Sequence, residues 1–201
     1  MFRTFWIFIL LLGAPLTSHA ATLSLDGTGR LIGAFGVAVG DDLYDVRFRE
    51  GTFADVFGQP AGDIMSFTLA NQLSQALLAQ VLVNSIEGNF DSDPERTLGC
   101  ESDFLCGILS PVRRTPNPPG DDIVVGTRTL NFDPLSGNPD TQQSFTLDVT
   151  ESTEDFTFTN DQVWAEWSPS AAVTVPIPAA LPLLASALLA CAGCRRRRAR
   201  R

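Results

Sequence analysis

The sequence of 201 residues contains no lysine and a single histidine, His19, which lies close to the N-terminus. Serine and cysteine nucleophiles normally need an adjacent histidine or lysine as a base. The chain beyond residue 20 has neither residue type, so we predict no nucleophilic catalysis and no catalytic residue of that kind. Histidine is also a principal nitrogen ligand of zinc, and we predict no metal or cofactor site.

Basic residues are scarce in the central part of the chain. Residues 21–174 hold seven arginines and all 23 acidic residues, which gives this part a formal charge of −16. A segment with this much negative charge, which we call the body, repels the phosphate backbones of nucleic acids, so we predict no nucleic-acid partner. Paired carboxylates could still act as acid and base on a polysaccharide, although so many acids form pairs by accident and single out no site.

The N-terminal segment, Met1 to Ala20, has the three parts of a secretory signal peptide. Arg3 gives the positive start, Phe5–Leu12 is the apolar run, and small residues stand at Ser18 and Ala20. The apolar run is too short to span a bilayer comfortably, which disfavours an uncleaved anchor. We predict that signal peptidase cuts between Ala20 and Ala21.

The C-terminal segment, Val175 to Arg201, forms a second three-part pattern, with an apolar stretch that follows a proline-containing motif and ends in an arginine block. A helix from Pro182 to Cys194 would be about 20 Å long, shorter than the ~30 Å hydrocarbon core. Neighbouring residues and snorkelling arginines must then complete the span. The positive-inside rule predicts a cytoplasmic anchor at Arg195, Arg196, Arg197 and Arg198.

The motif before this stretch reads Val175, Pro176, Ile177, Pro178 and Ala179. The two prolines deny a helix to the residues just outside the predicted membrane span and hold them extended. Proteases usually bind their substrates as extended strands, so the motif is a candidate cleavage site. Cys191 and Cys194 are interpreted as small apolar helix residues of the tail.

This tail resembles the PEP-CTERM sorting signals, in particular the VPLPA-CTERM variant, with Ile177 in place of the usual leucine. The resemblance implies export by a Gram-negative bacterium and transient anchoring in the inner membrane. It also implies cleavage by an exosortase, release to the cell surface or medium, and association with exopolysaccharide or biofilm matrix. An ordinary single-pass inner-membrane protein with a periplasmic domain is the alternative.

Between these ends the sequence predicts an α+β domain at 21–167, followed by a linker at 168–174. Apolar residues three and four apart predict one long helix from Phe67 to Asn84 with Ser66 as its N-cap. Alternation predicts a half-buried strand at Tyr44–Phe48, after a hairpin turn at Gly40-Asp41. Prolines make Asn89–Asp122 loop-like. Further strands are predicted at Ile123–Phe132, Gln143–Thr150, Asp155–Thr159 and Gln162–Trp167.

The expected fold is a mainly antiparallel sheet with one packed helix, apart from the C-terminal transmembrane helix; a β-sandwich with one helix is the alternative. In an exported protein Cys100 and Cys106 are expected to form a disulfide, whose loop is worth roughly 2 kcal/mol. Asp91, Asp93 and Glu95 could bind Ca²⁺, but the EF-hand template fails there and a solvated turn is favoured. Two function classes remain: a non-enzymatic surface or matrix protein, and a small carboxylate-dependent polysaccharide-active enzyme.

Overall fold

The computed structural model describes residues 20–58, 62–117, 121–150 and 161–171. The strands are β1 Thr22–Leu25, β2 Leu31–Val39, β3 Asp42–Arg49, β4 Gly62–Asp63, β5 Leu105–Asn117, β6 Asp121–Phe132, β7 Thr141–Thr150 and β8 Gln162–Pro169. The helices are α1 Phe53–Phe57 and α2 Phe67–Ala76, which continues as the π-helical segment Leu77–Val81, with short 3₁₀ turns at Pro94–Arg96 and Pro134–Ser136.

One mixed sheet of eight strands accounts for the architecture. Its order is β1-β2-β3-β8-β5-β6-β7, and β4 pairs with β5. The pairs are antiparallel except for β5 and β8, which run parallel from Gly107 opposite Gln162 to Leu109 opposite Trp164. The prediction of a mostly antiparallel sheet with one long helix is therefore confirmed, and the described strands share a single sheet rather than forming a sandwich.

Helix α2 forms where the sequence predicts it. The Ser66 hydroxyl accepts the Leu69 N–H at 3.1 Å and caps the first turn. The buried residues Ala70, Leu73 and Leu77 recur at helical spacing. The predicted end at Asn84 is wrong, because the helical segment ends at Val81 and the next residue, fully buried, leaves the helical conformation to enter the core.

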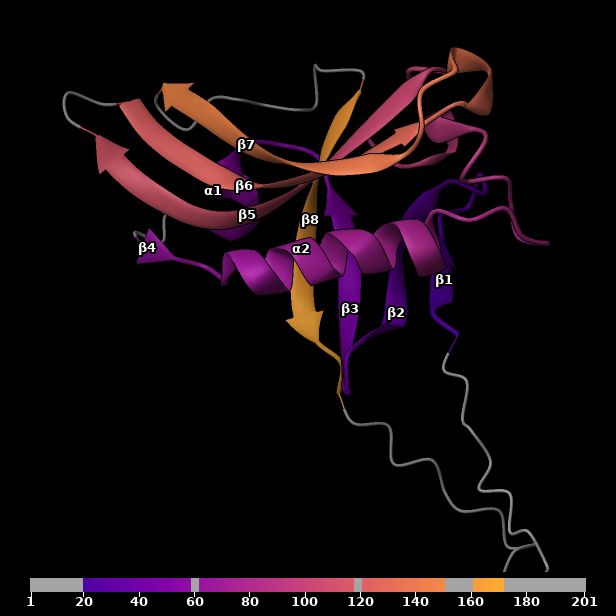
Figure 1. Cartoon of the computed structure of the whole chain (residues 1–201), viewed down its shortest axis with the longest axis horizontal. Helices are drawn as coiled ribbons and strands as arrows, with labels where there is room; N and C mark the ends of the chain where they lie inside the picture. The colour runs from indigo at the N-terminus through magenta and orange to yellow at the C-terminus, as the bar shows by residue number, and fades with distance from the viewer. Residues whose placement is uncertain (1–19, 59–61, 118–120, 151–160, 172–201) are drawn as a thin grey trace, which may run out of the picture. The chain divides into compact units, whose positions relative to one another are not determined.

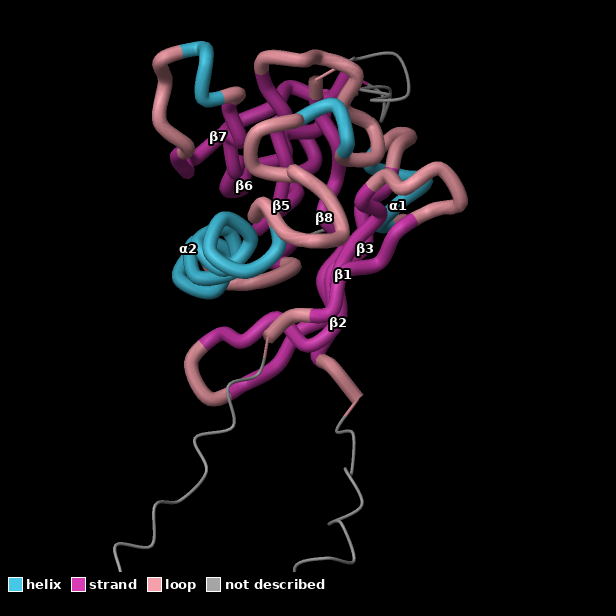
Figure 2. Tube along the Cα trace, turned by 90° about the vertical axis from the view of Figure 1, so that its right-hand side faces the viewer, coloured by secondary structure: helices cyan, strands magenta, loops and turns pink. Residues whose placement is uncertain are grey.

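The sheet curves around this helix. Figure 2 shows α2 end-on, with β5, β6 and β7 above it and the β2–β3 hairpin below. The main core lies between the helix and the concave face of the sheet. Its largest fully buried residues include Leu31, Phe48, Leu73, Leu82, Phe90 and Ile108. Burying one such side chain stabilises the fold by about 1.5–3 kcal/mol.

A smaller core covers the other face of the central strands. Trp164 is fully buried there with Phe53, Leu109, Val124 and Phe145. The ring of Phe53 meets Trp164 edge-on at a centroid distance of 5.6 Å, and the Trp164 Nε1–H donates to the Gly51 carbonyl at 3.1 Å. Strands β5 and β8 are therefore buried on both faces: Ile108 of β5 and Val163 of β8 lie in the main core, whereas the next residue of each strand, Leu109 and Trp164, lies in the smaller core.

The strands correct one sequence prediction and leave another untested. Residues 89–122 are not all loop, because β5 runs through Pro111 and Pro116. Pro111 is tolerated because it lies at a bulge, beyond the stretch that pairs with β8. Opposite it, Gly126 allows close approach: a Cβ there would lie 2.3 Å from the Ser110 carbonyl oxygen. The predicted strand Asp155–Thr159 lies outside the described residues.

The boundary between body and linker also moves. The sequence predicts a linker at 168–174, but β8 continues to Pro169, which pairs with Tyr44. Proline is accepted at this position because a strand end has no further ladder hydrogen bond to make there. The compact unit ends at Ser170, so the linker begins at Ala171.

Candidate functional site

The residues expected to carry function cluster at the ends of the chain, and the structure describes only their inner limits. Ala20 is exposed, and Ala21 is half-buried and packs against the main core. The motif Val175–Ala179, the predicted transmembrane helix and Arg195–Arg198 lie outside the described residues. Within the described part, no helix combines the length and apolarity needed to cross a membrane.

The beginning and the end of the body leave the sheet from the same end. Thr22, at the start of β1, pairs with Phe35 of β2. A bulge in β2 sets Phe35 and Gly36 opposite Asp45 of β3, and Asp45 pairs with Ser168 near the end of β8. These positions form one row across four strands. Figure 1 shows β1 beginning and β8 ending at the lower side of the sheet.

Asp45 joins the elements of this row. Its Oδ1 accepts the Gly36 N–H at 3.0 Å, which holds the bulge of β2. The same oxygen accepts the hydroxyl of Ser170, and the Ser170 N–H donates to the Leu43 carbonyl at 2.9 Å. Ser170 is thus fastened to β3 by its backbone and its side chain. We call the contacts of Ser170 with Leu43 and Asp45 the exit latch.

The tip of the β2–β3 hairpin lies beside the latch. Val39 pairs with Asp42 across the turn, as the sequence predicts for Gly40-Asp41. Gly40 has a φ of +62°, a left-handed conformation that favours glycine. Gly40, Asp41 and Asp42 are exposed. The end of the sheet from which the chain leaves is therefore formed by this tip and by Ser170.

The acidic turn considered for calcium is organised by an amide side chain. Asn84 Oδ1 accepts the backbone N–H groups of Asp91 and Ser92, each at 3.2 Å. Asn84 Nδ2 donates to the Asp91 carboxylate at 3.4 Å. Among the residues that the structure describes, no group of three or more acidic, histidine or cysteine side chains is arranged to hold a metal ion.

Asp91 instead meets a second carboxyl group from a distant part of the chain. Asp140, in the connection between β6 and β7, accepts the Phe132 N–H at 2.7 Å and lies within hydrogen-bonding reach of Asp91. Burial raises the pKa of Asp140 above its ordinary value; the Phe132 N–H opposes this and Asp91 adds to it. Glycosidases hold their carboxyl groups about 5 Å apart or more, so this touching pair does not fit that reaction.

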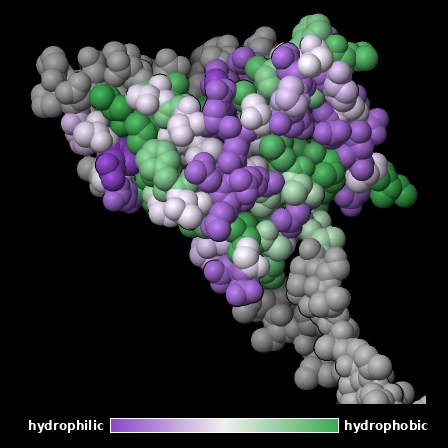
Figure 3. Space-filling view, viewed as in Figure 1, coloured by the Kyte–Doolittle hydropathy of each residue, from purple (hydrophilic) through white to green (hydrophobic). Residues whose placement is uncertain are grey.

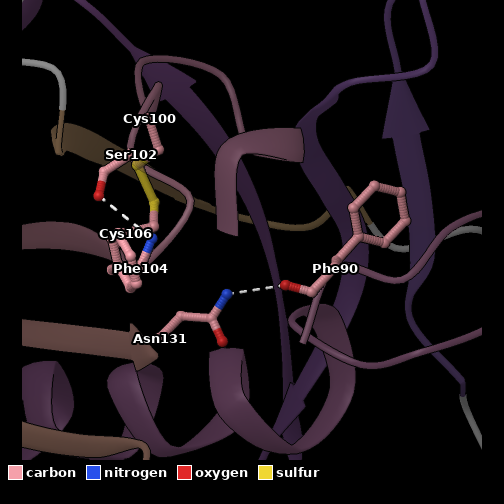
Figure 4. Close-up of a disulfide and its surroundings, with 6 residues drawn as sticks. All are labelled: Phe90, Cys100, Ser102, Phe104, Cys106 and Asn131. Atoms are coloured by element: carbon pink, nitrogen blue, oxygen red, sulfur yellow. Dashed lines mark hydrogen bonds between the residues drawn. A yellow bond between two sulfur atoms is a disulfide. The ribbon is translucent and has the colours of Figure 1, made fainter. Parts of the chain in front are cut away.

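The predicted disulfide is present. Cys100 and Cys106 are bonded, with their Cα atoms 5.4 Å apart, and both are buried. Figure 4 shows the bridge at the base of a loop that carries Phe104, whose N–H donates to the Ser102 hydroxyl at 3.3 Å. Nearby, Asn131 of β6 donates to the Phe90 carbonyl at 2.7 Å. The bridge therefore fixes the start of β5 next to the Phe90 part of the core.

Comparison of this chain with protein-family models, with curated proteins and with solved structures found no match. Evidence on function therefore comes from the sequence signals at the two ends of the chain and from the end of the sheet at Gly40–Asp42 and Ser170.

Proposed function

We propose that this chain is an exported surface or extracellular-matrix protein with a C-terminal sorting signal, and that its body acts without catalysis. Signal peptidase removes residues 1–20, and residues 180–201 hold the protein in the inner membrane. An exosortase-type membrane protease then cuts within Val175–Ala179 and releases the body. The observation that carries this proposal is the order of motif, apolar stretch and arginine block between Val175 and Arg201.

Two features of the body support the proposal. A buried disulfide suits an oxidising compartment outside the cytoplasm. The start of β1 and the end of β8 lie on one row at one end of the sheet. A body with both ends on one side can fold while it is connected to a membrane at either end or at both.

The surface of the body supports the proposal that the C-terminal tail, and not the body, attaches the protein to the membrane. On the face that carries α2, polar and apolar residues are interspersed over the described part (Figure 3). The acidic body is repelled by anionic lipid surfaces. Association with exopolysaccharide is a proposed destination of the released body.

The test is fractionation of a Gram-negative host with and without its sorting protease. With the protease, the mature protein should lose the mass beyond the motif and leave the membrane fraction. Without it, the protein should stay in the inner membrane and keep Arg201. Replacing both Pro176 and Pro178 by alanine should extend the helix outward and block cleavage. Normal release of that double variant, or native protein that always keeps Arg201, would favour the single-pass membrane protein instead.

A further inference from the structure

The distance between the folded body and the candidate cleavage motif is short. Among the described residues, Ser170 is the last one that is hydrogen-bonded to the body, through Leu43 and Asp45. Only four residues, Ala171 to Thr174, separate it from Val175. Fully extended, four residues span at most about 14 Å. The motif therefore cannot move far from the exit latch while the latch is closed.

A protease that acts on this motif must approach the body closely. Proteases grip several residues on either side of the bond that they cut, in an extended conformation. A bond within Val175–Ala179 lies at most eight residues, about 28 Å of extended chain, beyond Ser170, and the protease itself holds several of these residues. The surface of the protease around its active-site cleft then lies against the end of the sheet from which the chain leaves after Ser170.

We propose that this end, formed by the hairpin tip Gly40–Asp42 and the latched Ser170, is the face of the body that contacts the membrane-embedded sorting protease, and that the exit latch sets the reach of the motif. This inference rests on the proposed function. The row Thr22, Phe35, Asp45 and Ser168 supports it independently, because that row sends the N-terminal connection out at the same end. The segment before Thr22 and the segment after Ser170 therefore both leave the body at the end that faces the membrane in this proposal.

The first experiment changes the spacer in the full chain, in membranes that contain the protease. Deleting Ala171 and Ala172 leaves two residues, about 7 Å, before Val175 and should slow cleavage about tenfold or more. A control in which Ala171–Thr174 become Gly-Ser-Gly-Ser keeps the length and should be cut at the wild-type rate. Adding Ser170→Pro to the deletion removes both the hydroxyl and the N–H by which this residue is held to Asp45 and Leu43, so it should open the latch and restore part of the lost rate.

The second experiment places a bulky group on the body. Cys191 and Cys194 are first replaced by alanine, so that a single added cysteine takes a maleimide–polyethylene glycol chain. At Asp41→Cys, on the hairpin tip, the polymer should slow cleavage about tenfold. At Leu135→Cys, which is 92% exposed near the opposite end of the sheet, it should have little effect. Retention of the Cys100–Cys106 bridge shows in each case that the body has folded.

The outcomes separate the two proposals. If the unmodified chain is not cut by membranes that contain the protease, the proposed function fails. If the unmodified chain is cut, but the deletion is cut at the wild-type rate or the polymer slows cleavage equally at both positions, the contact face is wrong while the proposed function stands.

Discussion

At the scale of single residues, Asp140 occupies a position where a carboxylate is disfavoured. Its carboxyl is partly buried and faces Asp91, which raises its pKa, and only the Phe132 N–H favours the charged form. A raised pKa in the folded state means that the native structure prefers the protonated acid. Its stabilising contribution is therefore present below the ordinary pKa of an aspartic acid and is lost as the pH rises through the raised value.

Asp140→Asn should remove this pH dependence. The Asn oxygen can still accept the Phe132 N–H, and its amide can donate to Asp91. Since the site is partly solvated, we expect a gain of about 0.5 kcal/mol in unfolding free energy at pH 7, shrinking towards zero in acid. Urea unfolding at both pH values measures it. The exposed Asp103→Asn serves as control; an equal effect of the two variants at both pH values would contradict the explanation.

At the scale of elements, the π-helical segment after α2 protects the edge of β2. Strand β1 covers β2 only as far as Phe35. Beyond that point, Gln80 donates to the Ala38 carbonyl at 2.8 Å and accepts the Ala38 N–H at 2.9 Å. The side-chain amide thus takes the place of a neighbouring strand for one residue, and it ties the helical segment to the hairpin that carries the exit latch.

Gln80→Ala should leave both backbone groups of Ala38 without these partners. A partly buried unsatisfied group costs about 1–3 kcal/mol, so the variant should unfold at a clearly lower temperature. Differential scanning calorimetry measures the change. Gln75→Ala, at an exposed position of α2, should change the melting temperature little. A loss as large in the Gln75 variant would show that the edge contact does not set the effect, since alanine is the better helix former at both positions.

At the scale of the whole molecule, the processed N-terminus should coincide with the start of the sheet. Ala20 is exposed and Thr22 already pairs with Phe35. N-terminal sequencing of the exported protein is therefore expected to begin at Ala21. Ala20→Phe should abolish cleavage because signal peptidase requires a small residue there, and the intact mass should then include residues 1–20.

Ala20→Ser keeps a small side chain and is the matched control, which should be cut as the unmodified chain is. If the unmodified exported protein begins at Met1, the segment from Met1 to Ala20 forms a second membrane anchor and the topology changes.

By itself, the sequence determined the local features. The spacing of Leu69, Leu73 and Leu77 predicted helix α2, and the hydroxyl of Ser66 predicted its cap, because helical periodicity and capping act within a few residues. The hairpin turn Gly40-Asp41 and the Cys100–Cys106 bridge are also local in sequence. The tail signals at Val175–Ala179 and Arg195–Arg198 are likewise predicted from composition and order alone, and they stay predictions.

Only the tertiary structure decided which distant segments meet. Pro111 indicated a loop, yet it lies in β5, because the bulge there and Gly126 on β6 accommodate a proline that local propensity disfavours. The parallel pairing of β5 with β8 and the contact of Asp91 with Asp140 join residues about 50 positions apart, a range over which no periodicity extends. The exit latch has the same origin: Ser170 and Asp45 are 125 residues apart, and only the order β3-β8 in the sheet brings them together.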